Sequence, residues 1–150
     1  MIDDADVFYL SYWRATQRTS DGVAFLDAFY KNFLASSPEI ARRFEHTSFH
    51  ALTRMLSISI VHVAKYYQTR QPDPLLEILA VRHSQADLDI KPEWYEHWVA
   101  ALIDTVAIYD REFDDTKRES WRRVLAPGVE YMQSRYTGEP QEGSAKKSGS

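Results

Sequence analysis

Hydrophobic residues recur along this chain at spacings of three and four, which is the period of an amphipathic helix. The clearest run lies in residues 92–110 and includes Trp94, Trp98, Leu102 and Val106. Short polar or proline-containing segments separate it from similar runs elsewhere. The pattern predicts helices almost throughout the chain, over residues 4–18, 22–34, 38–44, 49–67, 75–83, 92–110 and 116–136.

Residues that favour helix ends mark several of these boundaries. Asp3 or Asp4 is expected to cap the first helix, and Ser20 or Asp21 the second, because each side chain can accept hydrogen bonds from free backbone amides. Within the last helix, Pro127–Gly128 removes a backbone donor and is expected to kink or break it.

The end of the chain differs in composition from the rest. From Thr137 the residues are small and polar, ending in GEPQEGSAKKSGS, and such a segment cannot bury enough apolar surface to fold. The sequence therefore predicts one helical domain, residues 1–136, and a disordered tail, residues 137–150. We see no internal repeat.

Composition narrows the class of protein. The chain has 150 residues, of which 44% are hydrophobic, enough for one core. Proline and glycine are scarce, at 6 and 5, which disfavours an all-β fold. The absence of cysteine excludes disulfides, thiolate metal sites and cysteine nucleophiles. A formal charge of −4 gives no support to nucleic-acid or anionic-membrane binding.

Targeting signals and several common catalytic motifs are also missing. The N-terminus, MIDDAD, is acidic where a signal peptide is basic, and no apolar run is long enough to span a bilayer. We therefore expect a cytoplasmic protein. The chain contains no phosphate-binding loop, dinucleotide glycine fingerprint or HExxH motif. The aspartate pairs at 3–4 and 114–115 are interpreted as helix caps.

One histidine stands on an apolar helical stripe. Leu75, Leu76, Leu79 and Ala80 recur at helical spacing, and His83 continues the same face just before a polar turn. A neutral imidazole in an apolar setting is a good iron ligand. Taken alone, this stretch favours the simpler interpretation, a core histidine bonded to a backbone carbonyl.

Four motifs in order make residues 3–136 resemble a bacterial globin, closest to the globin domains of haem-based sensors and their single-domain relatives. AFY resembles the motif that places a tyrosine, here Tyr30, over the haem. Phe44 matches a phenylalanine that stacks on the haem. LAVRH resembles the proximal helix, with His83 as the iron ligand, and DIKPEWY brings Tyr95 near that histidine.

This resemblance implies an all-α globin fold that holds haem b and binds O2, with CO and NO as further candidate ligands. Cofactor contacts are then expected from Tyr30, Phe44, Leu79, His83 and Tyr95. A globin of this kind is an oxygen binder or sensor without a catalytic cycle. The alternative is a haem enzyme, an NO dioxygenase or peroxidase-like protein, which would depend on an external reductase.

The distal wall departs from many globins. Aligning ALTRML with sensor-type globins places Leu52, Met55 and Leu56 on the distal side, so that Tyr30 is the strong hydrogen-bond donor there. A register shifted by two residues would instead bring His50 to the iron. The apolar register is favoured because His50 lies one turn before the apolar stripe begins.

Two further interpretations concern partners. Sensor-type globins commonly dimerise through their last two long helices, and Trp94, Trp98, Tyr109 and Trp121 offer much aromatic surface. We therefore expect a homodimer, with a separate signalling partner or reductase possible. A third interpretation is a helical interaction protein that binds no cofactor.

Overall fold

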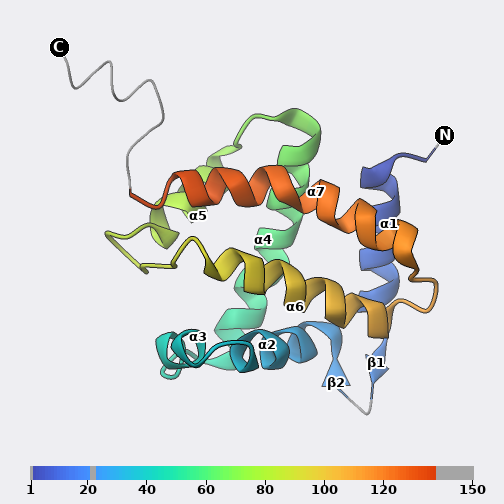
Figure 1. Ribbon diagram of the computed structural model, residues 1–150, viewed down its shortest axis with the longest axis horizontal. Helices are drawn as coiled ribbons and strands as arrows, with labels where there is room; N and C mark the ends of the chain where they lie inside the picture. The colour runs from blue at the N-terminus through green and yellow to red at the C-terminus, as the bar shows by residue number, and fades with distance from the viewer. Residues whose placement is uncertain (1, 21–22, 138–150) are drawn as a thin grey trace.

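The computed structural model describes residues 2–20 and 23–137, and Figure 1 shows their arrangement. In chain order the elements are α1 (Asp4–Thr16), β1 (Thr19–Ser20), β2 (Val23–Ala24), α2 (Phe25–Ala35), α3 (Pro38–Arg43), α4 (Phe49–Thr69), α5 (Pro74–His83), α6 (Trp94–Tyr109) and α7 (Asp115–Ser134). The prediction of an all-α chain is confirmed, with one short antiparallel ribbon added between α1 and α2. The predicted tail lies, from residue 138, outside the described residues.

Local chemistry accounts for most helix starts. Asp3 caps α1 in a capping box with Asp6, and Asp73 caps α5 by accepting from the amide of Leu76 at 2.8 Å. The predicted cap of the second helix at Ser20 is wrong, because Ser20 belongs to β1 and α2 begins after Ala24. The other candidate, Asp21, lies outside the described residues.

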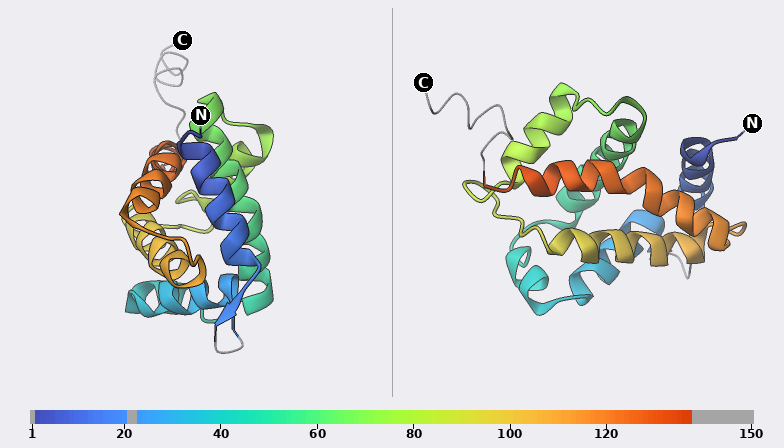
Figure 2. Two further views of the ribbon diagram at one scale, coloured as in Figure 1. Left: turned by 90° about the vertical axis from the view of Figure 1, so that its right-hand side faces the viewer. Right: turned by 45° about the horizontal axis from the view of Figure 1, so that its top comes forward.

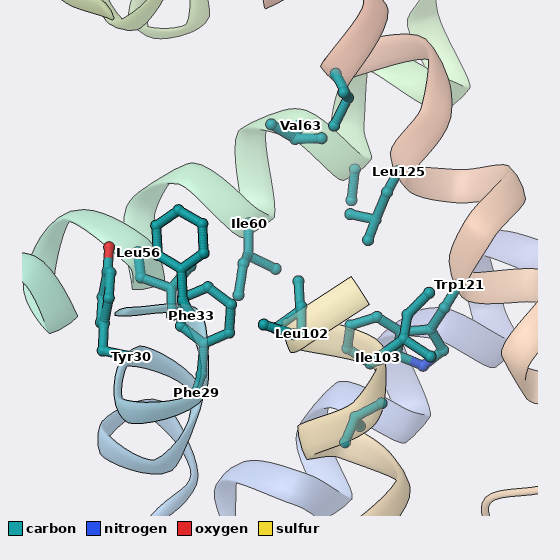
Figure 3. Packing of buried hydrophobic residues seen from close by; sticks show 14 of the residues in the cluster. Phe29, Tyr30, Phe33, Leu56, Ile60, Val63, Leu102, Ile103, Trp121 and Leu125 are labelled. Atoms are coloured by element: carbon teal, nitrogen blue, oxygen red, sulfur yellow. The ribbon is translucent and has the colours of Figure 1, made fainter. Parts of the chain in front are cut away.

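The helices lie in two layers. Helices α6 and α7 run antiparallel beside each other, and α4 crosses behind them at a steep angle (Figure 1). Seen from the side, α1 and α4 lie on the opposite face from α6 and α7, while α2 covers the lower end (Figure 2). Aromatic and branched side chains from α2, α4, α6 and α7 fill the space between them (Figure 3).

A buried carboxylate joins α1 to the ends of α6 and α7. Asp110, 1% exposed, accepts from Arg14 Nε at 2.6 Å and from Ser11 Oγ at 2.6 Å, and Trp121 Nε1 donates to Ser11 Oγ at 2.9 Å. Burial alone would raise the pKa of Asp110, but the bonds from Arg14 and Ser11 lower it. The stability this provides is present above the ordinary aspartate pKa and is lost as the pH falls through the lowered pKa.

Helix α7 continues through Pro127, so the predicted break does not occur, although its axis bends in Figure 1. The next residue, Gly128, packs directly against α4. A Cβ at Gly128 would lie 2.7 Å from Val63 Cγ1 and 2.8 Å from the carbonyl oxygen of Val63. The missing side chain therefore lets two helix backbones approach at this crossing.

The aromatic residues expected to form a dimer surface lie mostly in the core. Trp94, Tyr109 and Trp121 are 5%, 3% and 0% exposed, respectively, and Trp98 is half-buried. They pack against other helices of the same chain, so they are not evidence for an interface. Within the described residues, no helix is long and apolar enough to cross a bilayer; the cytoplasmic location stays a prediction.

Replacement of Gly128 tests the helix crossing. Gly128→Ala should lower the free energy of unfolding by about 1–3 kcal/mol, because overpacking outweighs the better helix propensity of alanine. Urea unfolding of both proteins measures the change. Thr116→Ala, at an exposed position of the same helix, is the control and should have little effect. An equal or higher stability of Gly128→Ala would contradict the close approach.

Candidate functional site

A cavity of about 80 Å³ lies among α2, α4, α5, α6 and α7. It brings together six of the eight site residues expected from the sequence, namely Tyr30, Met55, Leu56, Leu79, His83 and Tyr95. Phe44 and Leu52 are not among its lining residues. Sequence reasoning missed other lining residues, which include Phe33, Ser59, Val63, Ile90, Trp98, Val129 and Met132.

His83 is the last residue of α5 and contributes its ring to the cavity wall. Its Nδ1 lies 2.7 Å from the carbonyl oxygen of Leu79. Because a carbonyl oxygen can only accept, Nδ1 carries the hydrogen, and Nε2 keeps its lone pair. Burial lowers the pKa of His83 and favours the neutral ring. A ring held in this way by a backbone carbonyl is the usual arrangement of a metal-binding histidine.

Tyr30 faces the same cavity from α2. It is 6% exposed, and Figure 3 shows its hydroxyl directed from α2 toward α4. Within residues 2–20 and 23–137, this hydroxyl has no hydrogen-bond partner. Burial raises the pKa of Tyr30 well above its ordinary value, which keeps the phenol protonated. A buried, protonated and unpaired hydroxyl is an available donor for a ligand.

Tyr95 lines the cavity from the first turn of α6. Its hydroxyl also has no partner within the part of the chain that the structure describes. Burial raises the pKa of Tyr95 as it does for Tyr30. The cavity therefore holds two neutral phenols and one imidazole, on different helices.

The α4 wall is apolar at the positions expected from the favoured register. Leu56 is buried, whereas Met55 lines the cavity while remaining 41% exposed, so it lies at the edge. Leu52 is buried in the core without reaching the cavity. Phe44 does not line the cavity. Its ring centroid lies 6.4 Å from that of Phe33, which does line the cavity.

The histidines other than His83 lie elsewhere. His50, the alternative ligand, is exposed in the first turn of α4 and does not line the cavity. His62 Nδ1 lies 2.7 Å from a carboxylate oxygen of Asp73. Among the described residues, no group of three or more histidine and acidic side chains is arranged to hold a metal ion. The structure therefore offers one cavity imidazole and no bis-histidine pair.

The chemistry of the cavity fits an apolar group that carries one metal atom. None of the described side chains that line it carries a formal charge at neutral pH. His83 is the one among them that would become charged, by taking up a proton. The volume of about 80 Å³ is below the roughly 300–1,000 Å³ of typical ligand pockets. Admitting a haem therefore requires the walls to separate.

Comparison with known proteins gives one match at the level of a solved structure. No known family model matches the chain, and no curated protein does. The solved structure that matches is that of a protein from Pseudomonas aeruginosa PAO1, described as structurally highly homologous to a human hemoglobin. The two chains are 38% identical, the alignment covers 89% of this chain and 98% of the other, and the TM-score is 0.81.

Proposed function

Because this chain belongs to the bacterial globin family, we propose that it is a haem-binding globin that reversibly binds O2 and related diatomic ligands such as CO and NO. The globin fold expected from the sequence is confirmed by the likeness. The observation that carries the proposal is His83, whose Nδ1 bonds to the Leu79 carbonyl at 2.7 Å while the ring lines an uncharged cavity.

The residues around the cavity divide into two roles. His83 would hold the iron of haem b through Nε2, as the proximal histidine does in globins. Apolar contacts with the macrocycle would come from Leu56, Leu79 and Met55, and from the ring of Tyr95. Haem b would supply a metal atom with an open position for a diatomic ligand. Phe44 would contact the haem only if the helices around Phe33 moved apart.

Tyr30 is proposed as the donor that stabilises a bound ligand. Its hydroxyl is buried and without a partner among the described residues, and the neighbouring α4 wall offers Met55 and Leu56 rather than a histidine or glutamine. A hydrogen bond in a site of low dielectric is stronger than in water. A ligand that gains negative charge on binding, such as O2, therefore benefits more than CO.

Ligand binding is supported over enzymatic turnover by what lines the cavity. Peroxidase-like chemistry uses an acid–base side chain beside the reacting atoms. Among the described residues that line this cavity, His83 is the sole histidine and no carboxylate is present. NO dioxygenation with an external reductase is the second candidate function, because it needs bound O2 more than an acid–base group.

We also propose that the protein forms a homodimer. Because the aromatic residues expected at the interface are buried, the proposed interface lies elsewhere on α6 and α7. A groove of about 520 Å³ runs between α6 and α7, with Val99, Ala100 and Ala126 along it. Because the two helices are antiparallel, its acidic end contains Glu96 and Glu130, and its other end contains Arg118 and Arg122 together with Asp104, whose Oδ1 lies 3.9 Å from Arg118 Nη1. A twofold axis across the groove would place the acidic end of one chain against the basic end of the other.

Replacement of His83 tests the proposed haem ligand. His83→Ala should lose most of its bound haem, because the cavity then offers no nitrogen to the iron. Haem content and the visible spectrum after reconstitution measure this. His97→Ala is the matched control, since His97 does not line the cavity. A His83→Ala protein with the parent haem content and spectrum would rule out the assignment.

Replacement of Tyr30 tests the proposed donor. Tyr30→Phe keeps the ring and removes the hydroxyl, and a hydrogen bond to a strongly polarised partner contributes about 1.5–3 kcal/mol. O2 dissociation should therefore become about tenfold to a hundredfold faster, with a much smaller change for CO. Stopped-flow displacement of O2 by CO gives the rate. Tyr95→Phe is the comparison, and an unchanged O2 off-rate in Tyr30→Phe would exclude this role.

Light scattering of the haem-loaded protein tests the dimer. The parent chain should show a dimeric mass at micromolar concentration, and Ala100→Glu should shift it to a monomer by placing a charge in the groove. Ile108→Glu alters an exposed residue of the same helix that does not line the groove, and should leave the mass unchanged. A monomeric parent would refute the dimer, and a dimer that survives Ala100→Glu would refute this interface.

A further inference from the structure

Residues 84–93 join α5 to α6 and contribute to the cavity wall. Ile90, 7% exposed, lines the cavity together with His83. The amide of Ile90 donates to the carbonyl oxygen of His83 at 3.1 Å, and the amide of Leu88 donates to that of Arg82 at 2.9 Å. The segment therefore folds back on the helix end that carries the proposed iron ligand.

A cluster of three polar residues, Asp89, Lys91 and Tyr136, holds both chain neighbours of Ile90. We call it the Tyr136 cluster. The Tyr136 hydroxyl donates to the Asp89 carboxylate, and Lys91 Nζ lies 3.1 Å from Asp89 Oδ2 and 3.3 Å from the Tyr136 hydroxyl oxygen. The carbonyl oxygen of Tyr136 also accepts from the amide of Gln85 at 2.7 Å. One residue just beyond α7 thus contacts the segment at three positions.

The backbone at Asp89 shows why these contacts matter. Its φ is 55°, in the left-handed region that residues other than glycine adopt at a cost in free energy. Such a conformation persists where neighbouring groups hold it, and here the held carboxylate belongs to the same residue. The amide of Asp89 itself donates to the carbonyl oxygen of Ser84 at 2.9 Å, and the Tyr136 hydroxyl adds a side-chain contact to the same residue.

A second contact holds the segment from α3. Arg43 donates to the carbonyl oxygen of Leu88 through Nε at 2.8 Å and through Nη2 at 2.5 Å. Its neighbour Arg42 is exposed and makes no such bond to any described residue. The segment beside His83 is therefore fixed by Arg43 and by the Tyr136 cluster, neither of which lines the cavity.

We propose that Tyr136 and Arg43 are positioning residues for the imidazole of His83. They keep residues 84–93 folded against the end of α5, so that Ile90 stays in the cavity wall and the ring keeps its bond to the Leu79 carbonyl. The bond to Leu79 lies within one turn of α5, so by itself it does not fix the ring relative to other helices. The inference rests on the proposed role of His83 as the haem ligand.

Hydrogen exchange in the full chain as purified tests this without depending on haem. The variants are Tyr136→Phe and Arg43→Gln, with Tyr131→Phe and Arg42→Gln as matched controls. NMR follows the amides of Leu88 and Ile90 and the ring Nδ1 proton of His83. Because the Lys91 and Asp89 side chains are 39% and 40% exposed, loss of the Tyr136 hydroxyl should speed their exchange by about two- to fivefold. The controls should exchange as the parent does.

The haem-loaded proteins give the second readout. In the ferrous, ligand-free state, the iron–histidine stretching band in resonance Raman spectra should shift in Tyr136→Phe and Arg43→Gln and stay in place in both controls. Parent-like exchange at Ile90 and His83, or an unshifted band, would overturn the inference. If the parent chain bound no haem while exchange accelerated as expected, the proposed function would fail and the positioning of the ring would stand.

Discussion

The close approach of α7 to α4 at Gly128 and Val63 is the constraint on which the interior depends. With a Cβ position only 2.7 Å from Val63 Cγ1, the two backbones meet where any larger residue would push them apart. Val63 and Val129, on either side of this contact, both line the cavity. The crossing of the two helices at Gly128 therefore borders the cavity.

The two ends of the helix pair α6–α7 have different surroundings: a polar network at one end and uncharged side chains at the other. At the α6–α7 turn, Asp110 is surrounded by donors from Arg14, Ser11 and the backbone of Glu112, and Trp121 extends the network into the core. Breaking such a buried pair by removing one partner is costly because the other charge is left behind. At the far end, the same helices enclose uncharged walls. The charged network of the pair therefore lies apart from the cavity.

Burial sets the protonation states of the titratable groups that line the cavity. Burial lowers the pKa of His83 and raises those of Tyr30 and Tyr95, so each of the three groups is neutral near physiological pH. A neutral imidazole presents a lone pair, and a neutral phenol presents a hydrogen. The same desolvation thus prepares an acceptor site for a metal and donor sites for a ligand, and no charged neighbour competes with either.

The amino-acid sequence by itself determined what depends on neighbours within a few turns. Helix periodicity located α4, α5 and α6, aspartates marked the starts of α1 and α7, and His83 was recognisable because it ended an apolar stripe. Motif order then indicated the family. These features are local, because a helix and its caps are settled by residues three or four positions apart.

Tertiary structure decided the rest, since it depends on which faces meet. Periodicity placed Leu52, Met55 and Leu56 on one stripe, and only helix packing showed that Leu52 stops short of the cavity while Met55 lies at its exposed edge. Tyr109 and Trp121 were expected at a surface and are instead buried, because α1 packs against Trp121 and Phe25 and Val23 contact Tyr109. Tyr136 carried no sequence signal, since its side chain contacts Lys91 and Asp89, which lie 45 and 47 positions away. Such contacts exist only once distant helices are brought together.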